Sequence, residues 1–347
     1  MNTLFGMALC IFGGIGNGSF LLPLKFQKRW QWEHTWGIGI IWMYLIFPWV
    51  TAWFTVPNLL TVFRDAGAAN VGQTFFWGLV LGTGSLTFTI GIRLLGMALG
   101  YAVLMGMIVI FSTTIPLFVK NANQVGTVGG ITLLAGVAVF LLSVIICSVA
   151  GGRRKKETSS EKLGQNKSGK KANYPLAILV CVYSSFGCSA FYFAQAFADQ
   201  IKAAAIDHGA VPSAGADAVF CIQLLGAFIP NAIYVAIQLS RKRQWHLLGI
   251  GFSQGVLREY LLAIAIGFLW YYSVWLYGRA YSFMGPIGIP AGGAVFMAIN
   301  LLTGSGWGFK TGEWKNTSQS TKRIMVIGLL FLVVAVAIVG IGNYYSS

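Results

Sequence analysis

The most strongly charged stretch of this chain is GGRRKKETSSEKLGQNKSGKKAN, residues 151–173, and it separates two long apolar regions. It carries eight basic residues and is otherwise rich in Gly, Ser and Asn, a composition typical of a flexible tether. The regions 1–150 and 174–347 on either side consist almost wholly of apolar runs. We therefore expect two halves, residues 1–150 and 174–347, joined by a basic linker that carries no chemistry of its own.

The composition is that of an integral membrane protein. The 347 residues are 56 % hydrophobic and only 10 % charged, with a mean hydropathy of +0.71, whereas soluble domains carry about 25 % charged residues. The net charge of +15 does not indicate nucleic acid as a partner, because the basic residues lie between apolar runs and not on one face of a soluble fold. The partner that the composition does indicate is the lipid bilayer.

Ten segments are long and apolar enough to cross a bilayer, which takes about 20 residues. They are separated by charged residues and by clusters of Pro, Gly and Asn. Only Arg93 and Gly96 interrupt the apolar stretch between the third and fourth segments, but one span cannot be that long, so we expect a turn there. The expected spans are residues 3–23, 36–56, 75–93, 96–118, 128–150, 174–198, 218–239, 260–280, 284–305 and 323–343.

The basic residues predict the orientation of these spans, because positively charged connections stay cytoplasmic. Twenty of the 24 Lys and Arg residues fall in the odd-numbered connections, and only Arg64, Lys120, Lys202 and Arg279 fall in the even-numbered ones. The central stretch is therefore expected to be cytoplasmic and both termini to lie outside.

Five spans on each side of the linker predict an inverted repeat. Because five is odd, two similar halves enter the membrane in opposite directions, and secondary transporters commonly hold their substrate at the interface of such repeats. The fold class expected is thus an all-α integral membrane protein with ten transmembrane helices in two inverted five-helix repeats. Gly91-Ile92-Arg93 and Gly278-Arg279-Ala280 leave the third span of each half in a similar way.

No catalytic or metal-binding constellation is present in the sequence. Nothing resembles a phosphate loop, a nucleophile elbow or a His/Cys/Glu cluster, and the 23 linker residues are too few for a nucleotide-binding domain. An enzyme, a resident metal and a cofactor are therefore not expected. The nine acidic residues lie in connections or at span ends, and those nearest to the membrane, Asp199, Asp217 and Glu259, are expected to be interfacial. Without a carboxylate in the middle of a span, the coupling ion, a proton or sodium, stays open.

Uncharged polar residues inside the spans are candidates for a binding site. An amide or hydroxyl in hydrocarbon costs free energy unless it has a partner or faces a wet cavity. The alternative is that these groups hydrogen-bond between helices, at roughly 1 kcal/mol each. The candidates are Asn17, Ser85, Thr87, Thr89, Gln195, Gln223, Asn231, Ser273 and Asn300.

The eighth span is unusually aromatic. It contains Trp270-Tyr271-Tyr272-Ser273-Val274-Trp275, and the faces of aromatic rings pack against the apolar faces of sugar rings. An aromatic belt at the membrane surface is the alternative, but Trp270 and Ser273 lie near the middle of the span. We therefore expect Trp270 to pack on a ring of the substrate.

The first connection is rich in tryptophan and reads Pro23-Leu24-Lys25 followed by Lys28-Arg29-Trp30-Gln31-Trp32-Glu33-x-x-Trp36. It resembles the first cytoplasmic loop of the bacterial L-rhamnose/proton symporters of the drug/metabolite transporter superfamily, and it is the most specific likeness to that family. Further likenesses follow in the same order along most of the chain. They are Gly82-x-Gly84-Ser85-x-Thr87, Arg93-Leu94-Leu95-Gly96-Met97-Ala98-Leu99-Gly100, Gly267-x-x-Trp270-Tyr271 and Glu313-Trp314-Lys315-Asn316.

The resemblance implies a ten-helix carrier of the bacterial inner membrane that imports a deoxysugar with protons. It places Ser85, Thr87, Gln195 and Ser273 at positions where that family carries polar side chains. The function expected is import of a small neutral sugar such as L-rhamnose by alternating access, bound through Asn17, Ser85, Thr87, Gln195, Trp270, Ser273 and Asn300. The alternatives are an exporter of amino acids or other metabolites in the same superfamily, and a membrane enzyme or structural subunit.

Overall fold

The described residues of this protein, 3–95, 97–160, 174–249 and 254–346 of a computed structural model, form helices and turns without a strand. Ten of the helical segments are long and apolar enough to cross a membrane, which confirms the expected number of spans. Part of the predicted linker, residues 161–173, lies outside the described residues, as does Gly96 at the predicted third turn.

The long helices follow the predicted spans, but most of them extend beyond the predicted ends. The predicted spans ended where the apolar run ends, whereas charged and polar residues continue the helical backbone past that point. Helix α7 runs ten residues past the expected end at 150, and α5 begins seven residues before 75. The helices are α1 Thr3–Ser19, α2 Trp32–Ile40, α3 Phe47–Thr55, α4 Leu59–Ala66, α5 Ala68–Leu95, α6 Met97–Lys120, α7 Val128–Ser160, α8 Tyr174–Phe197, α9 Asp199–Asp207, α10 Gly215–Lys242, α11 Gln254–Ala280, α12 Gly288–Lys310 and α13 Gln319–Ser346.

The second span consists of α2, a π-helical turn and α3 in direct succession. The π turn, η2 Ile41–Ile46, comes immediately before Pro48 in the first turn of α3. Proline has no amide hydrogen to donate to the preceding turn, and its ring crowds the carbonyl four residues earlier, so a wider turn relieves both problems. Short 3₁₀ turns connect other helices, namely η1 Leu22–Phe26, η3 Ala122–Gln124, η4 Pro212–Ala214, η5 Trp245–Leu248 and η6 Tyr281–Phe283.

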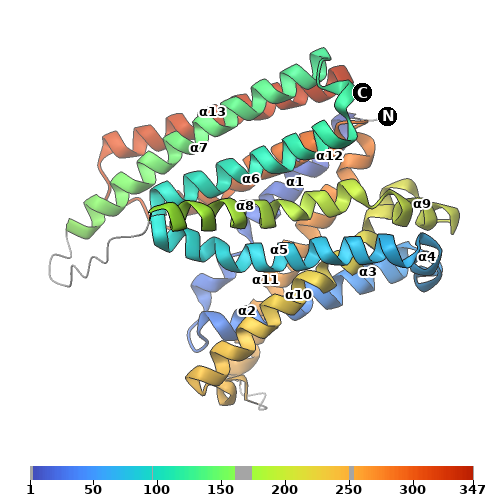
Figure 1. The fold of residues 1–347 in the computed structure, drawn as a ribbon. Coiled ribbons are helices and arrows are strands. Elements are labelled where there is room, and N and C mark those ends of the chain that lie inside the picture. Colours follow the sequence, from blue (N-terminus) through green and yellow to red (C-terminus); the bar gives the residue numbers. More distant parts are fainter. Residues whose placement is uncertain (1–2, 96, 161–173, 250–253, 347) are drawn as a thin grey trace.

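The closest helix pairs each join the region before the basic stretch to the region after it. Helix α1 packs against α11 and α12, α5 packs against α8 and α10, and α7 packs along α13. Figure 1 shows α7 and α13 side by side along one edge of the bundle. The two sequence halves therefore interleave, and any surface inside the bundle contains residues from both.

Two crossings of α5 have glycine on both helices. A Cβ atom built on Gly84 would lie 2.6 Å from the Cα of Gly187 in α8, and one built on Gly78 would lie 3.0 Å from the Cα of Gly226 in α10. Real Cβ atoms do not approach backbone this closely, so these two crossings bring backbone directly onto backbone. Small residues allow such close packing in membranes.

The two ends of the bundle differ. Helices α4 and α9 cap one end with a small apolar core that includes Leu59, Val62 and Ile201, and Figure 1 shows both termini at this end. The last turns of α7 and the connection between α12 and α13 lie at the other end.

Candidate functional site

A cavity of about 670 Å³ opens among seven of the long helices at the end where α7 terminates. Pockets of roughly 300–1,000 Å³ are typical of small-molecule sites. Most of the surface of this cavity is apolar, with a few polar groups and three tryptophans among the lining residues. The lining residues are Asn17, Gly18, Phe20, Leu21, Trp32, Trp36, Ser85, Phe88, Ile92, Met105, Cys147, Ser148, Gly151, Arg154, Asn300, Leu301, Gly304, Ser305, Gly308, Glu313, Trp314 and Met325.

The cavity brings together three of the predicted binding residues. Asn17 of α1, Ser85 of α5 and Asn300 of α12 all line it, although more than 200 residues separate the last two in sequence. Neither side-chain amide has a hydrogen-bond partner among the described residues, whereas Ser85 Oγ donates to the Gly82 carbonyl at 2.8 Å. An unpartnered amide offers both donors and an acceptor, so this wall can bind the hydroxyl groups of a polar, neutral molecule.

Two stacked tryptophans form another wall of the cavity. The rings of Trp32 and Trp36 on α2 have centroids 5.3 Å apart and planes inclined by 15°. The Trp36 indole N–H donates to Asn231 Oδ1 at 3.1 Å, and Asn231 Nδ2 in turn donates to Ser85 Oγ at 3.3 Å. The buried amide of Asn231 thus holds both the Trp36 ring and the Ser85 hydroxyl in place.

The predicted second span began at Trp36, which left Trp32 in the first connection, and neither ring was assigned to the site. Helix α2 begins at Trp32, four residues earlier than the predicted span. A spacing of four residues places both rings on one face of the helix. The signal was therefore the Trp-x-x-x-Trp spacing, which becomes informative only once the start of the helix is known.

Charged residues surround the mouth of the cavity. Lys25 Nζ lies 2.6 Å from Glu313 Oε1, and Arg154 Nη1 lies 3.2 Å from Glu313 Oε2. The hydrogen bond from Lys25 holds the pKa of the Glu313 carboxyl below its usual value, with a further contribution from Arg154. The Arg154 guanidinium also lies 5.0 Å above the Trp314 ring. Three segments that are distant in sequence, the first connection, the end of α7 and the last connection, are joined here.

Two other predicted residues are hydrogen-bonded away from the cavity. Thr87 Oγ1 donates to the carbonyls of Thr83 and Gly84 in its own helix, each at 3.0 Å. Gln195 is fully buried, donates to Gln223 Oε1 at 3.3 Å and accepts a hydrogen bond from Tyr281 at 2.8 Å. Both side chains have their polar atoms satisfied by protein, as the interhelical alternative predicts.

The predicted residues of the eighth span, helix α11, also lie outside the lining of the cavity. Trp270 packs edge-on against Tyr44, with ring centroids 5.2 Å apart. Ser273 donates to the Leu269 carbonyl of its own helix and is buried against α1, where a Cβ on Gly16 would collide with its hydroxyl. The aromatic lining of the cavity therefore comes from Trp32 and Trp36 of α2 together with Phe20, Phe88 and Trp314, and not from α11.

The opposite end of the bundle is closed by buried aromatic rings. Tyr277 lies at the centre, with ring centroids 5.5 Å from Tyr192 and 5.6 Å from Tyr281 and Phe296. All four rings are buried. These rings fill the interior of the bundle at the end away from the cavity.

Two of the three acids expected at the interface are buried. Asp217, in the first turn of α10, is fully buried and pairs with Arg279 of α11 at 2.6 Å. Glu259 is 1 % exposed, and its Oε1 accepts the backbone N–H groups of Lys28 at 3.0 Å and Arg29 at 3.3 Å. The location of these two acids near the ends of spans did not predict their burial, because neighbouring helices and turns cover both carboxyl groups.

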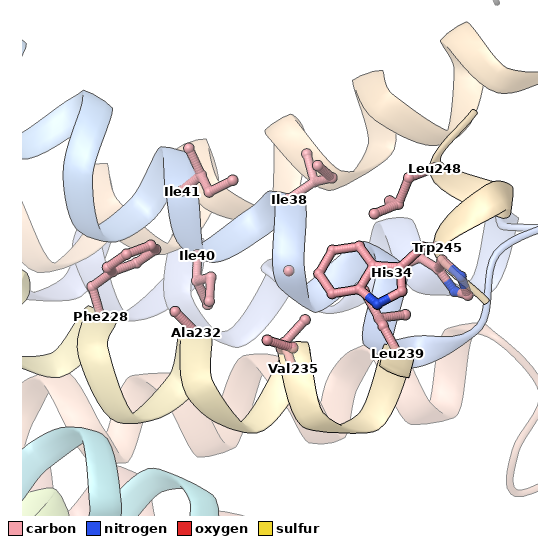
Figure 2. A pocket seen from close by; sticks show the side chains of 12 residues that line it. His34, Ile38, Ile40, Ile41, Phe228, Ala232, Val235, Leu239, Trp245 and Leu248 are labelled. Carbon is pink, nitrogen blue, oxygen red and sulfur yellow. The ribbon is translucent and has the colours of Figure 1, made fainter. Parts of the chain in front are cut away.

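A second, apolar pocket of about 160 Å³ lies between α2, α10 and η5. Figure 2 shows Ile38, Ile40 and Ile41 facing Phe228, Ala232 and Val235, with His34 and Trp245 at one end. Its lining has almost no polar surface for a hydrophilic solute. Within the described residues no group of three or more His, Cys, Asp or Glu side chains is arranged to hold a metal ion.

Comparison with known proteins places the chain in a family. Residues 1–344 match the family described as L-rhamnose-proton symport protein (RhaT). The L-rhamnose-proton symporters of Cronobacter sakazakii, Escherichia coli and Yersinia pestis are 27 %, 26 % and 25 % identical to it, over 97 %, 96 % and 98 % of both chains. Because the match extends through both halves and the linker, the chain belongs to the L-rhamnose-proton symport protein family.

Proposed function

We propose that this protein imports L-rhamnose, or a similar deoxysugar, together with protons across the bacterial inner membrane. The observation that carries the proposal is the cavity, where the free amides of Asn17 and Asn300 lie with the stacked rings of Trp32 and Trp36. The relatives that match the chain over nearly its full length are named L-rhamnose-proton symporters. A deoxysugar has hydroxyl groups that require such amides and an apolar ring face that packs on indole.

Asn17, Asn300 and Ser85 are the residues that contact the sugar hydroxyls in this proposal. Trp32 and Trp36 pack on the ring, a role that replaces the one predicted for Trp270. Thr87, Gln195, Trp270 and Ser273 support the site through helix packing, because their polar atoms or rings have partners within the bundle.

The cavity opens toward the cytoplasm in this proposal. Its mouth contains Lys25, Arg154 and Glu313, from the connections that the positive-inside rule makes cytoplasmic. The aromatic cluster around Tyr277 then closes the periplasmic side, where both termini lie. In this proposal, the arrangement is the inward-open state of an alternating-access cycle.

The pairing of helices supports two inverted five-helix repeats. Number the ten spans in chain order and replace each by the span five places earlier or later. The contact of α1 with α11 then becomes the contact of α8 with α5. The contact of α1 with α12 becomes the contact of α8 with α6. The contact of α7 with α13 maps onto itself. This pattern is expected of the drug/metabolite transporter superfamily, and repeats of this kind move against each other around a central site.

Uptake of labelled L-rhamnose into vesicles that contain the purified protein tests the proposal. An inwardly directed proton gradient should drive accumulation, and dissipating the gradient should reduce it to equilibration. Absence of any sugar uptake, with or without gradients of protons or sodium, would exclude a sugar importer. Accumulation driven by a sodium gradient alone would support the sugar as substrate and would make sodium, in place of the proton, the coupling ion.

A further inference from the structure

Asp217 is the most deeply buried ion-pair partner among the described residues, and its two oxygens differ. Oδ2 accepts the Arg279 Nη2–H at 2.6 Å and the Thr55 hydroxyl at 2.7 Å. Oδ1 is buried and has no hydrogen-bond partner in the described part of the chain. A buried carboxylate oxygen without a partner is costly as an anion, and it is the atom to which a proton can add without first displacing a donor.

Further unsatisfied polar atoms lie around this carboxylate. On α11, Tyr271, Trp275 and Arg279 follow one another at intervals of four residues and so share a helix face. The Tyr271 hydroxyl and the Trp275 N–H are both buried and without a partner at bonding distance, although Trp275 faces Asp217 and Tyr271 faces Thr51. Polar groups thus continue from Asp217 along α11 and α3 into the membrane.

The ion pair joins elements that must separate if the closed end is to open. Asp217 lies in the first turn of α10, Arg279 lies in the last turn of α11 and Thr55 is the last residue of α3. Arg279 is also held by Ser213 Oγ at 3.1 Å and by the Trp275 ring, 5.0 Å from its guanidinium carbon. This end lies opposite the mouth of the cavity, where the other end of α10 pairs Lys242 with Glu33 at 2.6 Å.

From this arrangement we propose that Asp217 is the carboxylate that binds the coupling proton, and that its ion pair with Arg279 locks the outer end of the transporter. This inference rests on the proposed proton-coupled import. A proton from the outer solution adds to Oδ1 and converts the carboxylate to a neutral acid. Arg279 keeps its own proton and its contact with Trp275 of its own helix, while its hydrogen bonds to Asp217 and Ser213 can break, so that the ends of α3, α10 and α11 become free to part. Loss of the proton restores the ion pair and closes that end.

The other ionisable groups around Asp217 do not provide a competing site. Cys221 lies one turn further along α10, Tyr271 belongs to α11 and Tyr281 to η6, and α3 contributes only the Thr55 hydroxyl. Lys202 of α9 lies over the Tyr281 ring, and Asp199 pairs with Lys120 nearer to the surface. Asp217 is therefore the single carboxylate in this cluster that is both buried and within bonding distance of a cation.

Transport by Asp217→Asn in vesicles tests the proposal, because two assays separate coupling from binding. Without a gradient, the rate of exchange of external for internal L-rhamnose should stay within about twofold of that of the unmodified protein. Accumulation driven by a proton gradient should fall by about tenfold or more, because an amide cannot take up and release the coupling proton. Asp199→Asn, which removes a more exposed carboxylate at the same end, is the matched control and should accumulate normally. Accumulation by Asp217→Asn at the unmodified level would overturn the proposal.

A milder variant covers the case in which Asp217→Asn loses exchange or does not fold. Thr55→Val keeps the shape of the side chain and removes one hydrogen bond to the carboxylate, which favours the protonated acid. The alkaline limb of the pH profile of accumulation should then move to higher pH by about one unit. An unmoved profile would show that the ion pair is structural and would overturn the proposal. If the unmodified protein neither exchanges nor accumulates L-rhamnose, the proposed function fails instead.

Discussion

The rings of Trp32 and Trp36 are stacked 5.3 Å apart on the wall of the cavity, and Asn231 holds the second ring by its N–H at 3.1 Å. Trp36 therefore has a fixed orientation before any ligand arrives, so little of its side-chain entropy is lost on binding. An aromatic wall fixed in this way favours a ligand with a flat apolar face.

Replacing Trp36 by Ala should weaken sugar binding. Aromatic packing beyond simple burial contributes about 0.5–1.5 kcal/mol, so we expect the KM for L-rhamnose uptake to rise by roughly three- to tenfold. Trp53→Ala is the control, because Trp53 is 67 % exposed on α3 and does not line the cavity. An unchanged KM for Trp36→Ala would show that the stacked pair does not contact the sugar.

Replacing the cavity amides by Leu should affect transport more than stability. Asn17 and Asn300 have no partners to lose, and each hydrogen bond to a sugar hydroxyl is worth about 1 kcal/mol, or roughly a fivefold change in KM. Gln195→Leu is the contrasting variant, because it leaves Tyr281 and Gln223 without their buried partner. Its free energy of unfolding should fall by about 1–3 kcal/mol. Thermal unfolding and uptake kinetics on the three variants check both outcomes, and a stable Gln195→Leu with a raised KM would return Gln195 to the site.

Introducing a methyl group at Gly84 should destabilise the bundle. The new Cβ would lie 2.5–2.7 Å from the backbone of Gly187 and Cys188, and overpacking of this kind costs about 1–3 kcal/mol. Gly72 lies on the same helix with nothing within 4 Å of a Cβ atom, so Gly72→Ala should be neutral or slightly stabilising. Equal melting temperatures for the two variants would contradict the close crossing.

Lys202 should make stability depend on pH in the alkaline range. Burial lowers the pKa of its ammonium group to about 8, an effect partly offset by Asp199. Between about 8 and the ordinary lysine pKa of about 10.4 this side chain binds more protons in the unfolded chain than in the folded one, so its contribution to stability rises with pH there. The difference in melting temperature between the unmodified protein and Lys202→Met should therefore change with pH in favour of the unmodified protein, whereas the difference for Lys155→Met, at an exposed site, should stay constant. A difference for Lys202→Met that does not change across this range would contradict the assignment.

Hydropathy and length were sufficient to predict ten spans, since each span must be apolar along its own sequence. The third and fourth expected spans correspond to two helices, with α5 ending at Leu95 and α6 beginning at Met97, whereas the turn expected at Gly96 lies outside the described residues. These properties are local, so no knowledge of neighbouring helices was needed. The start of α2 at Trp32 was missed because polar residues surround that helical turn.

The residues that line the cavity were only partly predictable, because a polar residue in a span does not reveal which helix it will face. Asn17 and Asn300 line the cavity, whereas Gln195 faces Gln223 and Tyr281. The difference arises from packing between helices far apart in sequence. The pairing of Asp217 with Arg279, 62 residues away, is of the same kind.

The contact between Gly84 and Gly187 also has a mechanical consequence. Because no side chain lies between the two backbones, one helix can pivot on the other without any change of rotamer. The first residue of α5, Ala68, is about 24 Å along the helix from this point. A pivot of about 10° would therefore move Ala68 by about 4 Å while the crossing itself stays in place. In the proposed alternating-access cycle, such a pivot would move the end of α5 that lies beside α4 and α9, away from the cavity.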